Sequence, residues 1–240
     1  MTDRRTARLV GGLFILATVA GAASLPLVSS LTSRNYLLKT ASEESRVATG
    51  VIIILVMAAA IIAIPIVLYP VLRRFGARMA IGYIVARAIE GLTVIVSTLG
   101  ALALVTLSRK FVAVGTHDAA SYRVVGDTLV SGRDWVDGAL GVAAFCLGAL
   151  ILNYALFRAR LVPQWLPAWG LAGAALYLAG GVMVLYGMEP MSATQWALDM
   201  PLAVQEMVLA VWLIVKGFNV PAVPSVHAAE AELEAASAAA

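Results

Sequence analysis

Six long apolar stretches, each about 20 residues or more, are the feature that most constrains this chain. About 20 apolar residues in a helix cross the roughly 30 Å of hydrocarbon in a bilayer. Short polar segments with charges or turn formers separate the stretches, so the sequence predicts an all-α bundle of six transmembrane helices in residues 1–220. The stretches cover residues 9–31, 47–72, 79–107, 135–157, 164–187 and 200–218, and an Ala/Glu tail of low complexity follows at 221–240.

The composition supports a membrane protein and argues against other classes. Hydrophobic residues make up 61% of the chain and charged residues only 13%, about half the usual charged share of roughly 25%. The net charge of +3 is spread over short loops and forms no basic face, so no nucleic-acid partner is expected. Cys146 is the single cysteine, which excludes an intrachain disulfide.

The distribution of Lys and Arg predicts the orientation in the membrane. With the N-terminus inside, nine basic residues fall on the inner side and seven on the outer side, and Arg73, Arg74, Arg158 and Arg160 lie in tight inner loops. Because basic loops stay in the cytoplasm, both termini are expected there. The first stretch has a rival interpretation as a cleaved signal peptide, but its apolar run is long enough to span, which favours a membrane anchor.

The segment Ser108–Asp134 is expected to be the one sizeable water-exposed loop, on the outer side. It mixes basic and acidic residues, and a short helix is expected around residues 119–130. The tail after Pro221 consists mainly of Ala and Glu, a composition typical of a solvated end that adds nothing to the folded core.

Three charged residues fall inside the predicted helices, where each costs at least about 2.5–3.5 kcal/mol unless it is paired or hydrated. Arg87 and Glu90 are three residues apart on one helix, so they share a face and can pair. Tyr83 and Ser97 continue that face. Glu206 in the last helix lies at a similar depth, so the sequence predicts a buried polar cluster of Arg87, Glu90, Glu206, Tyr83 and Ser97.

This cluster has two interpretations. It can line a site for a lipid or a small molecule, or the charges can simply fix the packing of the helices. Asn153 is expected to form an interhelical hydrogen bond, and the small residues at Gly148, Gly173 and Gly181 are expected to let helices approach closely.

Several familiar site types are missing from the sequence. The only histidines, His117 and His227, fall in the predicted outer loop and in the tail. The bundle therefore offers no histidine for haem or zinc or for a Ser–His hydrolase, and no phosphate-binding Gly-rich loop occurs. We expect no metal, no cofactor and no catalytic residue of these classes.

The order of several short motifs resembles a bacterial membrane family, domain-of-unknown-function family 4386. The motifs are Arg8-Leu9-Val10-Gly11, Leu68-Tyr69 with Arg73, Arg87-x-x-Glu90, Tyr154-x-x-Phe157-Arg158 with Pro163, and Pro201…Glu206…Trp212 through Asn219. The resemblance implies a six-helix protein of the bacterial inner membrane with no assigned activity, and it carries over Arg87, Glu90 and Glu206 as family features. The chain departs from the pattern at Ile61, where the family has an acidic residue, and at Gly148, where a histidine is frequent.

These observations leave three hypotheses for the function. The first is a binding or transport module for a small ligand or lipid, with Arg87, Glu90 and Glu206 lining a polar pocket. The second is a structural or regulatory subunit that docks to a membrane protein partner. The third is an enzyme with an unfamiliar carboxylate site. A cavity of a few hundred Å³ beside the charges would favour the first hypothesis, and close packing around a closed ion pair would favour the second.

Overall fold

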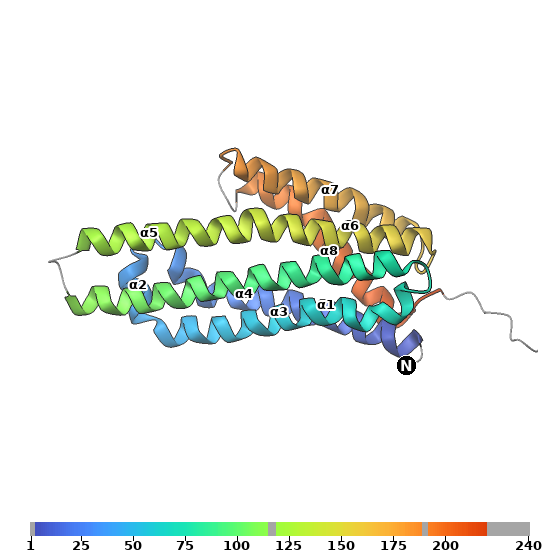
Figure 1. Cartoon of the computed structure of the whole chain (residues 1–240), viewed down its shortest axis with the longest axis horizontal. Coiled ribbons are helices and arrows are strands. Elements are labelled where there is room, and N and C mark those ends of the chain that lie inside the picture. The colour runs from blue at the N-terminus through green and yellow to red at the C-terminus, as the bar shows by residue number, and fades with distance from the viewer. Residues whose placement is uncertain (1–2, 115–118, 189–191, 220–240) are drawn as a thin grey trace, which may run out of the picture.

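The computed structural model describes residues 3–114, 119–188 and 192–219, and these residues contain helices and no strand (Figure 1). The fold is all-α, as the sequence predicts. The predicted tail at 221–240, and both histidines, lie outside the described residues. The elements in chain order are α1 (Asp3–Val28), η1 (Ser29–Thr32), α2 (Tyr36–Ser42), α3 (Glu44–Leu72), α4 (Ala77–Val114), α5 (Ala119–Trp135), the π-helical turn η3 (Val136–Gly141), α6 (Val142–Arg158), α7 (Trp165–Leu185) and α8 (Ala193–Val215).

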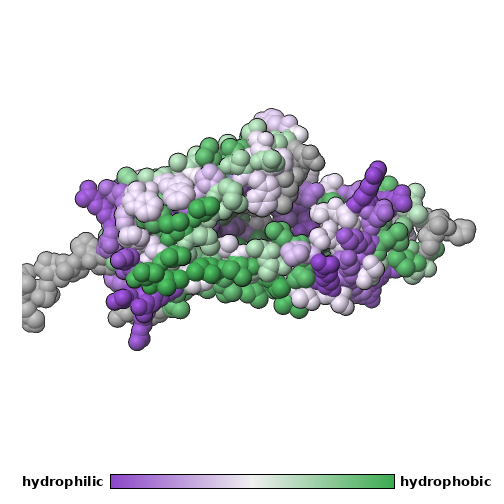
Figure 2. Space-filling view, turned by 180° about the vertical axis from the view of Figure 1, so that it is seen from behind, coloured by the Kyte–Doolittle hydropathy of each residue, from purple (hydrophilic) through white to green (hydrophobic). Residues whose placement is uncertain are grey.

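Within the described residues, six helical segments are long and apolar enough to cross a membrane. The prediction of six membrane-spanning helices is therefore confirmed, and the protein is membrane-embedded. A hydrophobic band separates two hydrophilic regions on the molecular surface, as expected for a protein that sits in a bilayer (Figure 2). The segments are Asp3–Thr32, Glu44–Leu72, Ala77–Val114, Ala119–Arg158, Trp165–Leu185 and Ala193–Val215.

The helices extend well beyond the apolar stretches that predicted them, and this corrects the expected outer loop. Where the segment over 108–134 is described it is helical, since α4 continues to Val114 and α5 runs without a break through η3 into α6. The short helix expected around residues 119–130 is thus the first part of a helical segment of 40 residues. Apolar content shows which part of a helix can lie in hydrocarbon, but a helix ends only where its backbone hydrogen bonds stop.

The first and last spanning helices also begin earlier than predicted. Helix α1 begins at Asp3, ahead of the apolar stretch at 9–31. Helix α8 begins at Ala193, and the side chain of Ser192 caps it by accepting a hydrogen bond from the backbone N–H of Gln195 at 3.3 Å. The early start of α8 places seven more residues in this helix than the sequence predicted, and one of them is charged.

The six spanning segments pack in a closed ring. Helix α1 packs against α3, α3 against α4, α4 against α6, α6 against α7, α7 against α8, and α8 returns to α1. Glycines lie at the closest crossings. A Cβ added at Gly173 would lie 3.0 Å from the backbone of Leu202, and one at Gly181 would lie 2.5 Å from Val142. The prediction that these small residues serve helix packing is confirmed.

One end of the ring carries a second, smaller layer. Helices α4 and α5 extend side by side past the ends of α7 and α8, and α2 packs against α4 there (Figure 1). The Tyr36 hydroxyl donates a hydrogen bond to a carboxylate oxygen of Asp127 at 2.8 Å, which joins α2 to α5. Arg109 and Glu44 form an exposed ion pair at 2.7 Å between α4 and α3. These polar contacts add to a hydrophobic cluster at this end of the molecule, which includes Leu31 and Leu104.

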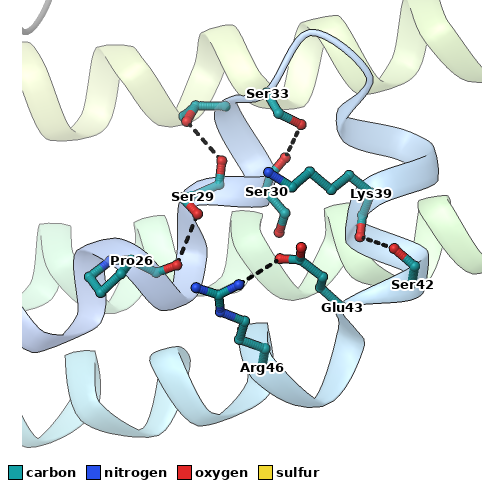
Figure 3. Close-up of polar contacts among 9 residues, drawn as sticks. Pro26, Ser29, Ser30, Ser33, Lys39, Ser42, Glu43 and Arg46 are labelled. Carbon is teal, nitrogen blue, oxygen red and sulfur yellow. Dashed lines mark hydrogen bonds and ion pairs between the residues drawn. The ribbon is translucent and has the colours of Figure 1, made fainter.

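Serine hydroxyls close the turn that connects α1 to α2 (Figure 3). The hydroxyl of Ser29 donates to the carbonyl oxygen of Pro26 at 2.9 Å, and that of Ser33 donates to the carbonyl oxygen of Ser30 at 2.8 Å. A short hydroxyl side chain can donate a hydrogen bond to a nearby backbone carbonyl that would otherwise accept one from a helical N–H. The chain therefore leaves α1 and reverses direction within a few residues.

Candidate functional site

Arg87 and Glu90 of α4 form a buried ion pair. The guanidinium Nη1 lies 3.0 Å from the Glu90 Oε2, and the two residues are only 3% and 7% exposed. The pairing follows from the sequence, because residues three apart on a helix are neighbours on one face. The attraction between the two charges offsets part of the desolvation free energy that each loses on burial.

Side chains from two other helices enclose the Arg87 guanidinium. Its Cζ lies 5.9 Å from the ring centre of Phe14 on α1 and 5.8 Å from that of Phe145 on α6. A cation within about 6 Å of an aromatic face is stabilised by the ring electrons. Gly148 of α6 lies against the aliphatic part of the side chain, where an added Cβ would be 2.9 Å from the Arg87 Cδ. Arg87 is therefore fixed by three helices.

Glu206 lies on α8 and is not paired with Arg87. It interacts electrostatically with Arg87, but these two described residues form no ion pair within 4.0 Å. Glu206 is partly exposed, whereas Arg87 and Glu90 are buried. Because Glu90 takes the close position beside the guanidinium, the charge of Glu206 has no direct ion-pair partner among the described residues.

Tyr83 lies one turn before Arg87 on α4 and joins the same cluster. The residue is 1% exposed, and its hydroxyl has no hydrogen-bond partner among the described residues. It interacts electrostatically with Arg87, Glu206 and Glu90. Leaving a buried hydroxyl without a partner costs about 1–3 kcal/mol, so this group is available for a hydrogen bond to a water molecule or a ligand.

Ser97, the fifth residue of the predicted cluster, lies elsewhere. Its hydroxyl donates to a carboxylate oxygen of Asp137 at 2.7 Å and accepts from the Nε of Arg133 at 3.0 Å. Ten residues separate Ser97 from Arg87, about 15 Å along the helix. The continuous fourth span carries Arg133 and Asp137 to this position, so the predicted polar face divides into two clusters.

Asp199 lies near the interior cluster, beside Tyr177 of α7, although the sequence analysis did not single it out. It lies seven residues before Glu206, on the same face of α8, and is partly buried. Its Oδ1 has no hydrogen-bond partner among the described residues. Tyr177 of α7 interacts electrostatically with both carboxylates. The helix was expected to begin at residue 200, and only the cap at Ser192 could have signalled the earlier start.

A separate hydrogen-bond network joins α6, α7 and α8. The Nε2 of Gln205 donates to the Oδ1 of Asn153 at 3.1 Å and to the carbonyl oxygen of Leu166 at 3.2 Å. The prediction that Asn153 makes an interhelical hydrogen bond is confirmed. Gln205 is fully buried and was not singled out in the sequence. This network fixes the position of α8 beside Glu206.

The interior cluster carries more negative than positive charge. Arg87 supplies one positive charge, while Glu90 and Glu206 supply two negative charges when ionised, and Asp199 lies further along α8. Among the residues that the structure describes, no group of three or more His, Cys, Asp or Glu is arranged to hold a metal ion. Two surface pockets in the described part of the chain, of about 490 and 650 Å³, are lined by residues outside this cluster. Around Arg87 itself the packing is close.

The fold and these residues define an all-α, polytopic membrane protein with a charged cluster inside its helical bundle. Residues 9–217 match the family described as "Domain of unknown function (DUF4386)", and the chain belongs to this family. Searches of curated proteins and of solved structures found no match.

Proposed function

We propose that this protein binds or transports a small, positively charged organic ligand at an interior site formed by Glu206, Asp199 and Tyr83. The observation that carries the proposal is the unpaired charge of Glu206. Glu90 already occupies the close position beside Arg87 at 3.0 Å, so the guanidinium leaves Glu206 without a direct ion pair. An uncompensated carboxylate inside a bilayer is costly, and a bound cation or a proton relieves that cost.

The neighbouring groups favour an organic cation over a metal ion. Tyr83 offers a buried hydroxyl without a partner among the described residues, and the hydroxyl of Tyr177 lies within electrostatic range of Glu206 and Asp199. Hydroxyl and carboxylate oxygens together can accept the several hydrogen bonds that an ammonium group donates. Glu206 and Asp199 are both partly exposed, so a ligand can reach their carboxylates.

A second candidate function is a structural or regulatory membrane subunit. The enclosure of Arg87 by Phe14, Phe145 and Gly148 favours it, because a closed and tightly packed ion pair fixes helix positions without any ligand. The pockets of about 490 and 650 Å³ also favour it, since neither is lined by the charged residues of the cluster. The two candidate functions differ only in the role they give to Glu206. The Arg87–Glu90 pair serves packing under either proposal, and the role of Glu206 separates them.

Glu206→Gln provides the test, because it removes the charge and keeps the shape. The purified protein in detergent is titrated with ammonium ions of increasing size, from ammonium to tetraethylammonium, against sodium at equal ionic strength. We expect at least one organic ammonium ion to raise the melting temperature of the wild type and to have no effect on Glu206→Gln. Glu44→Gln is the matched control, since Glu44 is a surface carboxylate paired with Arg109, and it should keep the response.

The outcomes separate the two functions. If no ammonium ion acts on the wild type, and Glu206→Gln is as stable as the wild type or more so, the structural function is favoured. If Glu206→Gln folds but keeps the full ammonium response, the ligand does not bind at Glu206 and the proposed site is wrong.

We further propose that the protein resides in the bacterial inner membrane with both termini in the cytoplasm. The basic tight loops at Arg73 and Arg158 support this orientation. Single cysteines at the exposed positions Val124 and Ala77 test it in whole cells, since the native Cys146 is buried. A membrane-impermeant thiol reagent should label Val124→Cys from outside and leave Ala77→Cys unlabelled. The reverse pattern would contradict the orientation.

A further inference from the structure

An apolar groove of about 650 Å³ runs along the outer face of α8. Thr18 of α1 lines one side of it. The α8 residues that line the groove are Met200, Ala203, Val204, Met207, Val208, Val211, Trp212, Val215 and Lys216. From Met200 to Lys216 the groove follows about 24 Å of helix, which exceeds the roughly 15 Å depth of one leaflet. Its length and its apolar lining suit the acyl chain of a lipid.

Two cationic residues, Lys216 and Arg4, lie near one end of this groove. Lys216 ends the groove on α8, and Arg4 of α1 lies beside Gly217, with its Cγ 4.0 Å from the position of an added Cβ. Figure 1 shows α8 ending near the start of α1, and the two helices pack together. Arg4 and Lys216 are exposed, and neither forms an ion pair with a described residue.

The carboxylate nearest to Arg4 in sequence is already engaged. Asp3 forms an ion pair with Arg74 at 2.9 Å, so it does not neutralise Arg4. The groove therefore combines a long apolar surface in the membrane-spanning region with two free cations at its end. Basic pockets beside membrane helices bind anionic lipid headgroups. A neutral occupant would leave both cations unpaired.

We propose that this groove is a binding site for an anionic phospholipid, whose acyl chain lies along α8 and whose phosphate lies between Arg4 and Lys216. The site is on the outer face of α8, so it is separate from the interior cluster, and it does not depend on the function proposed for Glu206.

The test measures lipid retention by the purified full chain. Delipidated protein in detergent receives phosphatidylglycerol or phosphatidylcholine with identical acyl chains, and native mass spectrometry counts the lipids retained. We expect one phosphatidylglycerol to be retained in preference to phosphatidylcholine. The double variant Arg4→Gln/Lys216→Gln should bind it roughly thirtyfold less tightly, because each surface cation contributes about fivefold. Arg78→Gln, an exposed basic residue on another helix, is the control and should retain it.

Two further measurements distinguish the groove from simple charge attraction. Val204 lines the groove and is 46% exposed, so Val204→Trp fills the groove without entering the core and should reduce retention while both cations remain. Glycerol phosphate, which has the headgroup chemistry without the acyl chain, should not compete. Equal retention of both lipids, full retention by the double variant, or effective competition by glycerol phosphate would overturn the proposal. If the protein lost the phosphatidylglycerol only when it dimerised, a second copy of the chain would occupy the groove, and this result would also overturn the proposal.

Discussion

Replacing Arg87 by alanine tests how much the buried ion pair contributes to stability. The change leaves Glu90 as a buried charge without the partner that lay 3.0 Å away, and it removes the guanidinium contacts with the rings of Phe14 and Phe145. Removing one partner of a buried pair costs about 3–5 kcal/mol. Protonation of Glu90 offsets part of the loss and the missing ring contacts add to it, so we expect a net loss within that range.

The loss is measurable as a shift in thermal unfolding of the purified protein in detergent. For a chain of this length each kcal/mol lowers the melting temperature by about 2–4 °C, so Arg87→Ala should lower it by roughly 6–20 °C. Arg109→Ala is the matched control, because Arg109 pairs with Glu44 at 2.7 Å but is 62% exposed. An exposed pair contributes at most about 1 kcal/mol.

A compensating double variant separates the stranded charge from the lost packing. Arg87→Met/Glu90→Gln removes both charges and keeps most of the volume, and it should recover most of the stability, since well-packed neutral residues often replace a buried pair at little cost. The reasoning would be refuted if Arg87→Ala melted within a degree or two of Arg109→Ala. It would also be refuted if the double variant were as unstable as Arg87→Ala, because the loss would then come from packing alone.

Three other changes have expected outcomes that thermal unfolding can check. Gly148→Val should destabilise the fold by about 1–3 kcal/mol, because the new side chain overlaps that of Arg87. Gln205→Leu should cost about 1–3 kcal/mol, because it leaves the Oδ1 of Asn153 without its donor. Burial and a hydrogen bond to a carboxylate raise the pKa of Tyr36 from 10.0 to about 12. Its stabilising contribution is therefore fully present below pH 10 and lost as the pH rises through 12, and Tyr36→Phe should remove this dependence.

Each of these expectations has a contradicting result. A Gly148→Val variant as stable as the wild type would mean that α6 can move away from Arg87 at no cost. An unchanged Gln205→Leu would show that the network joining α6 to α8 contributes nothing to stability. If Tyr36→Phe lost stability between pH 10 and 12 to the same extent as the wild type, another group would be responsible for the alkaline transition.

The sequence alone determined the class of fold and one contact of the site. An apolar stretch of about 20 residues has no stable place other than a membrane or a protein core, so six of them predict six spanning helices. The Arg87–Glu90 pair follows with equal directness, because a spacing of three on one helix fixes the neighbours by local geometry. Neither inference needs any knowledge of how the helices are arranged.

The tertiary structure decided everything that depends on the rotation and depth of one helix against another. It left Glu206 without an ion pair to Arg87, and it moved Ser97 into a separate cluster with Asp137. It also placed Asp199 on α8 beside Gly180 of α7, because α8 begins earlier than its apolar stretch. Hydrophobic periodicity reports which residues face away from lipid but not which interior residues meet. Contacts between helices, such as that of Gly148 with the Arg87 side chain, decide which interior residues meet, and these contacts form only when the helices pack together.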